Sequence, residues 1–212
     1  MINKNKIISL IDWKKIHGNI PVIVQNNCSG EVLMHAFMNR QAIEQSIETS
    51  FVTFYSRTKK RLWKKGETSG NFLKIKKIFL DCDNDCLLIL VKPIGKTCHL
   101  DKNSCFSSKN NKHIPEFTFL YYLDNLIEHK KNDFNNFSYT NNLFQEGKKR
   151  IAQKVGEEAI EVVIAAIEKK NKDLIEESSD LIYHFLVLLH SHNLDLKVII
   201  ENLKSRYFIK NK

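Results

Sequence analysis

The chain of 212 residues is 42% hydrophobic, which is enough to bury a core and excludes global disorder. Its longest strongly apolar runs, at 86–91 and 185–190, are too short to cross a bilayer, and the first residues lack the features of a signal peptide, so we expect a cytoplasmic protein. Five cysteines, an odd number, favour thiols or metal ligands over disulfides.

The net charge of +9 is unevenly divided along the chain. Residues 1–113 hold 19 Lys and Arg against 9 Asp and Glu, whereas residues 114–212 hold 14 against 15. This break predicts two domains, 1–113 and 114–212, with a polar linker at 107–113. The basic half would suit nucleic acid or a polyphosphorylated small molecule, although abundant lysine also permits a merely solvated surface.

Before the linker, strand patterns alternate with polar turns. The segment 31–50 begins as a strand and becomes helical near Asn39, and the segment 72–91 is either one long strand or a hairpin that bends near Asn84. A polar loop lies between them at 64–71. We expect a mainly β, or α+β, domain. The remaining strand patterns lie at 20–25 and 51–57.

Beyond the linker, apolar residues recur at helical spacing. Only Gly147 and Gly156 interrupt this pattern. We therefore expect an all-α second domain without internal repeats. The predicted helices lie at about 115–130, 140–170, 172–192 and 194–208.

Three aspartates, Asp81, Asp83 and Asp85, stand at alternate positions before an apolar run. In a strand, alternate residues share one face, about 6–7 Å apart. Three like charges on one face repel each other unless a cation neutralises them, and ligand sets made only of oxygens suit Mg²⁺. The alternative is a solvated strand edge.

Cysteines near these aspartates suggest a second metal. By the same alternation, Cys82 lies on the opposite face, and Cys98 and Cys105 are its possible partners. Three thiolates and a water would make an open, catalytic zinc site, with His99 as a candidate catalytic proton shuttle. The spacing alone also fits three buried thiols without metal, because cysteine is often buried.

Acidic residues in the second half recur three or four positions apart, which places them on one face of each helix. They border apolar positions, where unpaired charge is costly. If the two helices pack antiparallel, four or five carboxylates converge into a site for Mg²⁺; the alternative is two solvated acidic faces with lysine partners. His184 follows one turn later. The acidic residues are Glu157, Glu158, Glu161, Glu177 and Asp180.

Residues 20–106 closely resemble phosphoribosyl-AMP cyclohydrolase. The resemblance rests on the motifs VLMHAFMNRQAI, FYSRTKKRLWKKGETSGNFL, LDCDNDCLLILV and PIGKTCHLDKNSCF. It implies Mg²⁺ at Asp81, Asp83 and Asp85, and Zn²⁺ at Cys82, Cys98 and Cys105, completed across a homodimer interface.

The resemblance also implies the chemistry of this half. A zinc-activated water would add at C6 of the adenine ring, and the N1–C6 bond would break. Two substrate phosphates need cations and backbone donors, and the alternative for those residues is an ordinary basic loop. The candidates are Arg57, Arg61, Lys64, Lys65, Glu67, Thr68, Ser69, Gly70 and Asn71.

Residues 115–206 resemble the all-helical, MazG-like nucleoside-triphosphate pyrophosphatases, and specifically phosphoribosyl-ATP pyrophosphatase. The resemblance rests on KRIAQKVGEEAIEVVIAA and ESSDLIYHFLVLL. It implies Mg²⁺ at Glu158, Glu161, Glu177 and Asp180, with Glu157 as an extra ligand, and Glu158 and Glu161 as catalytic residues. A metal-activated water would attack between the α- and β-phosphates. The candidates for holding the triphosphate are Lys148, Lys149, Arg150 and Lys154.

Taken together, the two halves resemble a fused enzyme for the second and third steps of histidine biosynthesis. The resemblance implies the small-molecule substrates phosphoribosyl-ATP and phosphoribosyl-AMP, and neither nucleic acid nor membrane as a partner. Two alternatives stay open: a basic, zinc-containing nucleic-acid-binding protein, or a chain in which only the pyrophosphatase half is active. The acidic clusters count against the first, because without metal they would repel a phosphate backbone.

Overall fold

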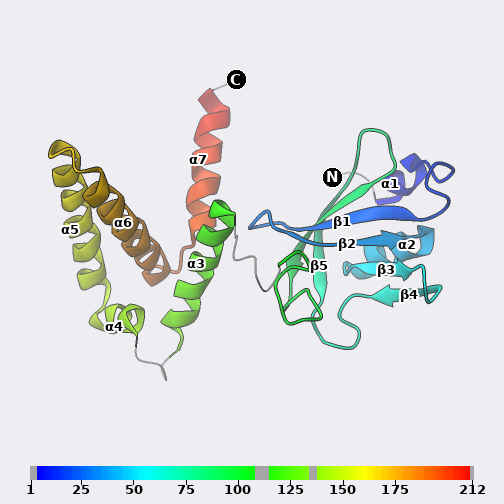
Figure 1. Ribbon diagram of the computed structural model, residues 1–212, viewed down its shortest axis with the longest axis horizontal. Coiled ribbons are helices and arrows are strands. Elements are labelled where there is room, and N and C mark those ends of the chain that lie inside the picture. Colours follow the sequence, from blue (N-terminus) through cyan, green and yellow to red (C-terminus); the bar gives the residue numbers. More distant parts are fainter. Residues whose placement is uncertain (1–3, 108–114, 134–137, 211–212) are drawn as a thin grey trace. The chain divides into compact units, whose positions relative to one another are not determined.

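The computed structural model describes three stretches of the chain, residues 4–107, 115–133 and 138–210. The chain divides into two units, Met1–Thr118 and Phe119–Lys212. Most of the linker predicted at 107–113 lies outside the described residues. Figure 1 shows the strands in the first unit and long helices in the second, which confirms the predicted order of a mainly β domain and an all-α domain.

The described residues of the first unit form six strands: β1 (Ile20–Asn26), β2 (Val32–Met38), β3 (Thr53–Ser56), β4 (Arg61–Lys64), β5 (Leu73–Leu80) and β6 (Leu87–Pro93). Four of them make one sheet in the order β2-β1-β6-β5. Within it, β1 is antiparallel to β2 and parallel to β6, while β5 and β6 form an antiparallel hairpin. The short strands β3 and β4 pair with each other.

The core of this unit follows from alternation along the strands. Ile20, Val22 and Val24 are fully buried, while the residues between them are partly or largely exposed. The helix α1 (Lys4–Leu10), which the sequence analysis did not predict, adds Ile7 and Ile8 to the same core. Its short apolar run has too few residues to show a helical period.

The predicted change from strand to helix near Asn39 is confirmed. The side chain of Asn39 accepts a hydrogen bond from the backbone N–H of Ala42 at 2.8 Å, which caps the start of α2 (Arg40–Thr49). Ser50 ends α2 in the left-handed conformation. The chain then enters β3.

The segment 72–91 is the predicted hairpin and not one long strand. Its turn, residues 81–86, is closed by Asp81, whose Oδ1 accepts from the backbone N–H groups of Asp85 and Cys86 at 2.9 and 3.0 Å. Asn84 adopts the left-handed conformation with a φ of 63°. The aspartates therefore lie on a turn, and the expectation that they alternate along a strand face with Cys82 opposite was wrong.

The second half of the chain contains the described helices α3 (Glu116–Lys131), α4 (Tyr139–Glu146), α5 (Lys148–Ile167), α6 (Asn171–Ser191) and α7 (Leu196–Lys210). The single helix predicted over 140–170 was wrong, because the chain breaks at Gly147. Gly147 has a φ of +88°, a conformation that side chains with a Cβ rarely adopt. This break lets α4 and α5 run in different directions (Figure 1).

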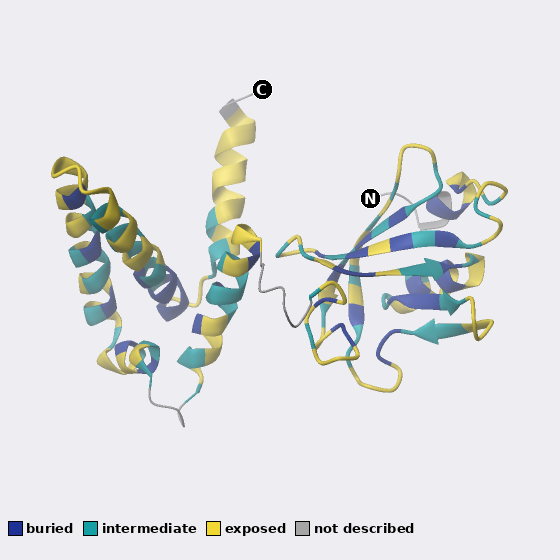
Figure 2. Cartoon of the chain, viewed as in Figure 1, coloured by how far each residue is buried: buried dark blue, intermediate teal, exposed yellow. Residues whose placement is uncertain are grey.

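Helices α5 and α6 pack along each other as an antiparallel hairpin (Figure 1). Their apolar core includes Ile151, Leu186 and Val187. A buried hydrogen bond of 2.9 Å between His190 Nε2 and Asp124 Oδ1 joins α6 to α3. Figure 2 shows α7 exposed over most of its length, and only Leu196 and Ile199 near its start are partly buried among its described residues. None of the described helices is both long and apolar enough to span a membrane.

Candidate active sites

The aspartate turn between β5 and β6 is the first candidate metal centre. Carboxylate oxygens of Asp81, Asp83 and Asp85 all lie within 4.8 Å of one another. Such a set of oxygen donors fits a hard divalent cation such as Mg²⁺. The ammonium group of Lys15 contacts Asp83 and Asp85, and these contacts raise the pKa of Lys15.

Two of the three predicted zinc ligands lie together. Burial, and then the neighbouring thiol of Cys98, raise the pKa of Cys105, and all five cysteines, each within the described residues, are free. Cys82 is exposed on the aspartate turn and does not join Cys98 and Cys105 in a cluster of metal-binding size among the described residues. One chain therefore offers two soft sulfur ligands, which fit zinc but do not complete a three-thiolate site.

Two neighbours of these thiols carry ionisable groups. His99 is exposed, with Nδ1 4.0 Å from the sulfur of Cys98. Lys65 is buried close enough to both thiols to act on them electrostatically, and burial lowers its pKa. Sequence reasoning had grouped Lys65 with the phosphate-binding candidates, and the structure places it beside the thiol pair.

The other candidates between residues 57 and 71 have separate surroundings. The guanidinium group of Arg57 stacks 3.5 Å from the centre of the Phe37 ring. Arg61 pairs with Glu67 at 3.0 Å, and the Lys64 ammonium lies 4.9 Å from the centre of the Phe51 ring. The exposed loop residues are Glu67, Thr68, Ser69 and Gly70.

The loop touches another segment of the domain through Asn71, and Gly66 closes the loop on itself. The side chain of Asn71 fills the space that a Cβ on Gly95 would occupy, so the loop touches the segment that leads to Cys98. At the other end, Gly66 is buried with a φ of +94°, and a Cβ there would lie 2.5 Å from the backbone oxygen of Asn71. This contact leaves room only for glycine.

We expect Gly66→Ala to damage the N-terminal domain selectively. The added methyl group meets backbone, so overpacking should lower the free energy of unfolding by about 1–3 kcal/mol beyond the backbone strain itself. Gly30→Ala is the matched control, because Gly30 also has a positive φ, of 73°, but nothing lies within 4 Å of its added methyl group. Chemical denaturation of both variants measures the difference, and equal losses would contradict it.

The acidic residues of α5 and α6 form the second candidate metal centre. Carboxylate oxygens of Glu158, Glu161 and Glu177 lie within 4.8 Å of one another. Lost hydration, and then the neighbouring carboxylate of Glu161, raise the pKa of Glu177. Asp180 acts electrostatically on Glu177 but lies outside this closest group. The donor set fits Mg²⁺.

Two of the predicted phosphate ligands, Arg150 and Lys154, are paired with acids. Lys154 Nζ lies 2.7 Å from Glu158 Oε1 and 3.1 Å from Glu157 Oε2. Arg150 lies 3.3 Å from Glu157 and 3.5 Å from Glu146. Glu157 is thus surrounded by cations and stands outside the closest carboxylate group.

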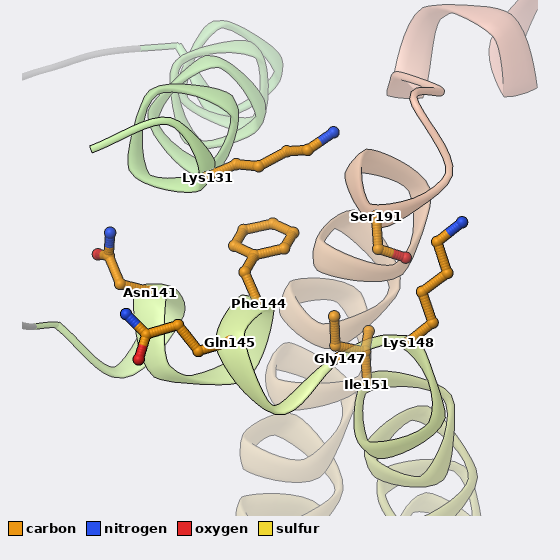
Figure 3. A pocket seen from close by; sticks show the side chains of 8 residues that line it. All are labelled: Lys131, Asn141, Phe144, Gln145, Gly147, Lys148, Ile151 and Ser191. Atoms are coloured by element: carbon orange, nitrogen blue, oxygen red, sulfur yellow. The ribbon is translucent and has the colours of Figure 1, made fainter. Parts of the chain in front are cut away.

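Lys148 has a different position, beside a cavity of about 320 Å³ at the start of α5. Figure 3 shows the Lys148 side chain along this cavity and Lys131 across it. Lys131 is already engaged, because its ammonium group donates to the backbone oxygen of His190 and to Asn193 Oδ1. Lys148 and the exposed Lys149 are therefore the cations of this segment that the structure does not show paired with an acid.

His184 is a buried neighbour of the acidic cluster, and sequence reasoning gave it no role. Its Nε2 lies 3.7 Å from Glu158 Oε1 and 3.3 Å from the hydroxyl of Tyr139. Burial lowers the pKa of His184. The signal in the sequence was its position one turn beyond Asp180, on the same helix face, but the contribution of Tyr139 from α4 has no such signal.

The chain thus carries separate candidate metal-binding clusters in a mainly β unit and in a helical unit, as a bifunctional enzyme with two metal sites would. Two family models match the chain, Phosphoribosyl-AMP cyclohydrolase over residues 34–107 and Phosphoribosyl-ATP pyrophosphohydrolase over residues 120–207.

Similar proteins cover almost the whole chain. The histidine biosynthesis bifunctional protein HisIE of Buchnera aphidicola subsp. Schizaphis graminum is 53% identical over 97% of this chain and 98% of its own. The protein of the same description from Escherichia coli K12 is 50% identical over 93% of this chain and 95% of its own. The chain belongs to this HisIE family of bifunctional histidine biosynthesis enzymes, which disfavours the alternative of a nucleic-acid-binding protein.

Proposed function

We propose that the helical domain hydrolyses phosphoribosyl-ATP to phosphoribosyl-AMP and pyrophosphate, and that the N-terminal domain then opens the adenine ring between N1 and C6. The observation that carries this proposal is that each domain gathers its own set of metal-ligand side chains. The product of the first reaction is the substrate of the second. We place the domain border at 113/114.

In the helical domain, the ligands proposed for Mg²⁺ are Glu158, Glu161, Glu177 and Asp180, with Glu157 in addition. When bound there, Mg²⁺ would act as a Lewis acid toward phosphate oxygens and would lower the pKa of a water ligand. The chain itself orients the donors, since Lys154 and His184 flank Glu158 in its buried position. Lys148 and Lys149 are the cations best placed to meet a triphosphate, and Arg150 and Lys154 can do so only by leaving their acids.

In the N-terminal domain, the ligands proposed for Zn²⁺ are Cys98 and Cys105 with Cys82 of the partner subunit. When bound there, Zn²⁺ would lower the pKa of a water ligand to about 7. His99 is placed beside Cys98 to accept the proton of the water that adds at C6 and return it to N1 as the N1–C6 bond breaks. The carboxylates of Asp81, Asp83 and Asp85 would hold Mg²⁺ near the phosphates.

A homodimer is part of the proposal. Beyond the split thiol set, apolar side chains on α5 are left exposed in the single chain, among them Ile160 at 62% and Ile167 at 75%. A second copy would cover such residues. We place this enzyme in the cytoplasm, with small-molecule substrates and without nucleic acid or membrane as a partner.

The direct test supplies phosphoribosyl-ATP with Mg²⁺ and Zn²⁺ and follows pyrophosphate release and ring opening separately. The full chain should catalyse both, and residues 114–212 alone should catalyse only the first. Ring opening without pyrophosphate release, or the reverse, would limit the chain to one activity. A soluble, folded fragment 114–212 that releases no pyrophosphate would contradict the proposed border.

A further inference from the structure

The aspartate turn already holds a cation that belongs to the chain itself. The ammonium group of Lys15 contacts Oδ2 of Asp83 and Oδ2 of Asp85 at the same time. Lys15 is separated from Asp83 by 68 residues, so this contact is made by the fold and not by local sequence. A single positive charge thus stands where the proposed function requires a divalent one.

The segment that carries Lys15 is fixed to the turn by its backbone. The N–H of Asp12 donates to the backbone oxygen of Asn84, in the middle of the turn, at 3.0 Å. Asp12 Oδ1 accepts from the N–H groups of Lys14 and Lys15 at 3.2 and 3.1 Å, which shapes the bend that aims Lys15. The segment is anchored in the domain by the buried side chain of Ile11.

The remaining aspartate is occupied in another way. Asp81 Oδ1 accepts the two backbone N–H groups that close the turn. Asp81 therefore keeps one oxygen for a cation, whereas Asp83 and Asp85 both contact Lys15. An ammonium group and a metal ion on the same oxygens repel each other strongly, because both are positive and only a few ångströms apart.

We propose that Lys15 is a built-in counter-ion that competes with the divalent cation for Asp83 and Asp85. Without metal, Lys15 relieves the repulsion among the carboxylates and keeps the turn in shape. When a divalent cation binds, Lys15 leaves, and the segment 11–19 loses its side-chain tie to the turn. The side chain of Lys15 is 44% exposed, so the ammonium group can move into water at little cost. This inference rests on the proposed Mg²⁺ site.

The test measures Mg²⁺ binding by titration calorimetry in the full chain. All proteins carry Glu161→Gln and Glu177→Gln, which weaken Mg²⁺ binding at the helical site. A protein that also carries Asp83→Asn shows which part of the binding heat comes from the aspartate turn. Lys15→Met should bind Mg²⁺ at the turn about three- to tenfold more tightly, the gain expected from removing an exposed ion pair to two carboxylates. Lys15→Arg, which keeps the charge, and Lys14→Met, which removes a neighbouring exposed lysine, should bind as the parent does.

A second measurement asks whether Lys15 leaves. In Mg²⁺-free buffer, Lys15→Met should melt at a lower temperature than the parent, and the difference should disappear at saturating Mg²⁺. If Lys15→Met binds Mg²⁺ no more tightly, or if its melting deficit persists at saturation, the competition is disproved while the metal site stands. If the Asp83→Asn change removes no heat of Mg²⁺ binding, the turn is not a Mg²⁺ site, and this inference fails together with that assignment.

Discussion

Glu158→Gln should abolish pyrophosphate release while ring opening of supplied phosphoribosyl-AMP continues. Glu158 is the buried member of the carboxylate group, and its partner Lys154 lies 2.7 Å away. Glutamine keeps the shape but removes the anionic ligand. Because the loss of residues that only support metal ligands costs about 10–100-fold, the loss of a ligand should cost about 100-fold or more. Coupled assays of the two products measure the effect.

Glu168→Gln is the matched control for this change. Glu168 lies at the end of the same helix, is exposed, and pairs with Lys170 at 2.7 Å. The same carboxylate-to-amide exchange there should leave both activities near the parent values. Equal loss of ring opening in Glu158→Gln would show that the two reactions do not use separate sites.

Mixed dimers of two inactive cysteine variants should recover ring opening. Cys82→Ser and Cys98→Ser should each be inactive as homodimers, because one sulfur ligand is removed from every zinc site. If the site joins Cys98 and Cys105 of one chain to Cys82 of the partner subunit, a mixed dimer holds one site with both lesions and one intact site. Up to half of the activity should return.

The control for this experiment is Cys28→Ser, an exposed cysteine outside the proposed site, which should keep full ring-opening activity. Pyrophosphate release should be unchanged in every cysteine variant, since the carboxylates lie in the other domain. A zinc site held within one chain would leave one lesion in each site, and mixing would restore nothing. Zinc content of the purified dimers, measured by metal analysis, separates lost metal from lost catalysis.

Local chemistry made much of the fold predictable. Asn39 indicated the start of a helix, because an asparagine side chain can cap the first backbone N–H groups. The alternation of apolar residues in β1 matches the buried face of that strand. The break at Gly147 was missed because the apolar period continues across it, and only the positive φ shows that the helix stops. For the segment 72–91, the sequence leaves a long strand and a hairpin as alternatives. The left-handed backbone conformation of Asn84, which decides between them, is seen only in the structure.

For the sites, the spacing of residues along one helix could be used for prediction, whereas contacts between distant segments could not be predicted. The sequence predicted that the carboxylates of α5 and α6 converge, because residues three or four apart share a helix face. It could not show Lys15 on the aspartate turn, His184 with Tyr139, or Lys65 beside the thiols, since these contacts join distant segments. The sequence analysis grouped the right three aspartates, but for the wrong reason, because they lie on a turn and not along a strand.

The presence of both clusters on one polypeptide fixes their stoichiometry. Each translated chain carries one acidic helical cluster and one share of the thiol and aspartate sites, so synthesis cannot supply one activity without the other. Complete degradation of the chain likewise removes both activities. The balance between the two capacities is therefore set by the turnover numbers of the domains, and the abundance of the protein changes both capacities in proportion.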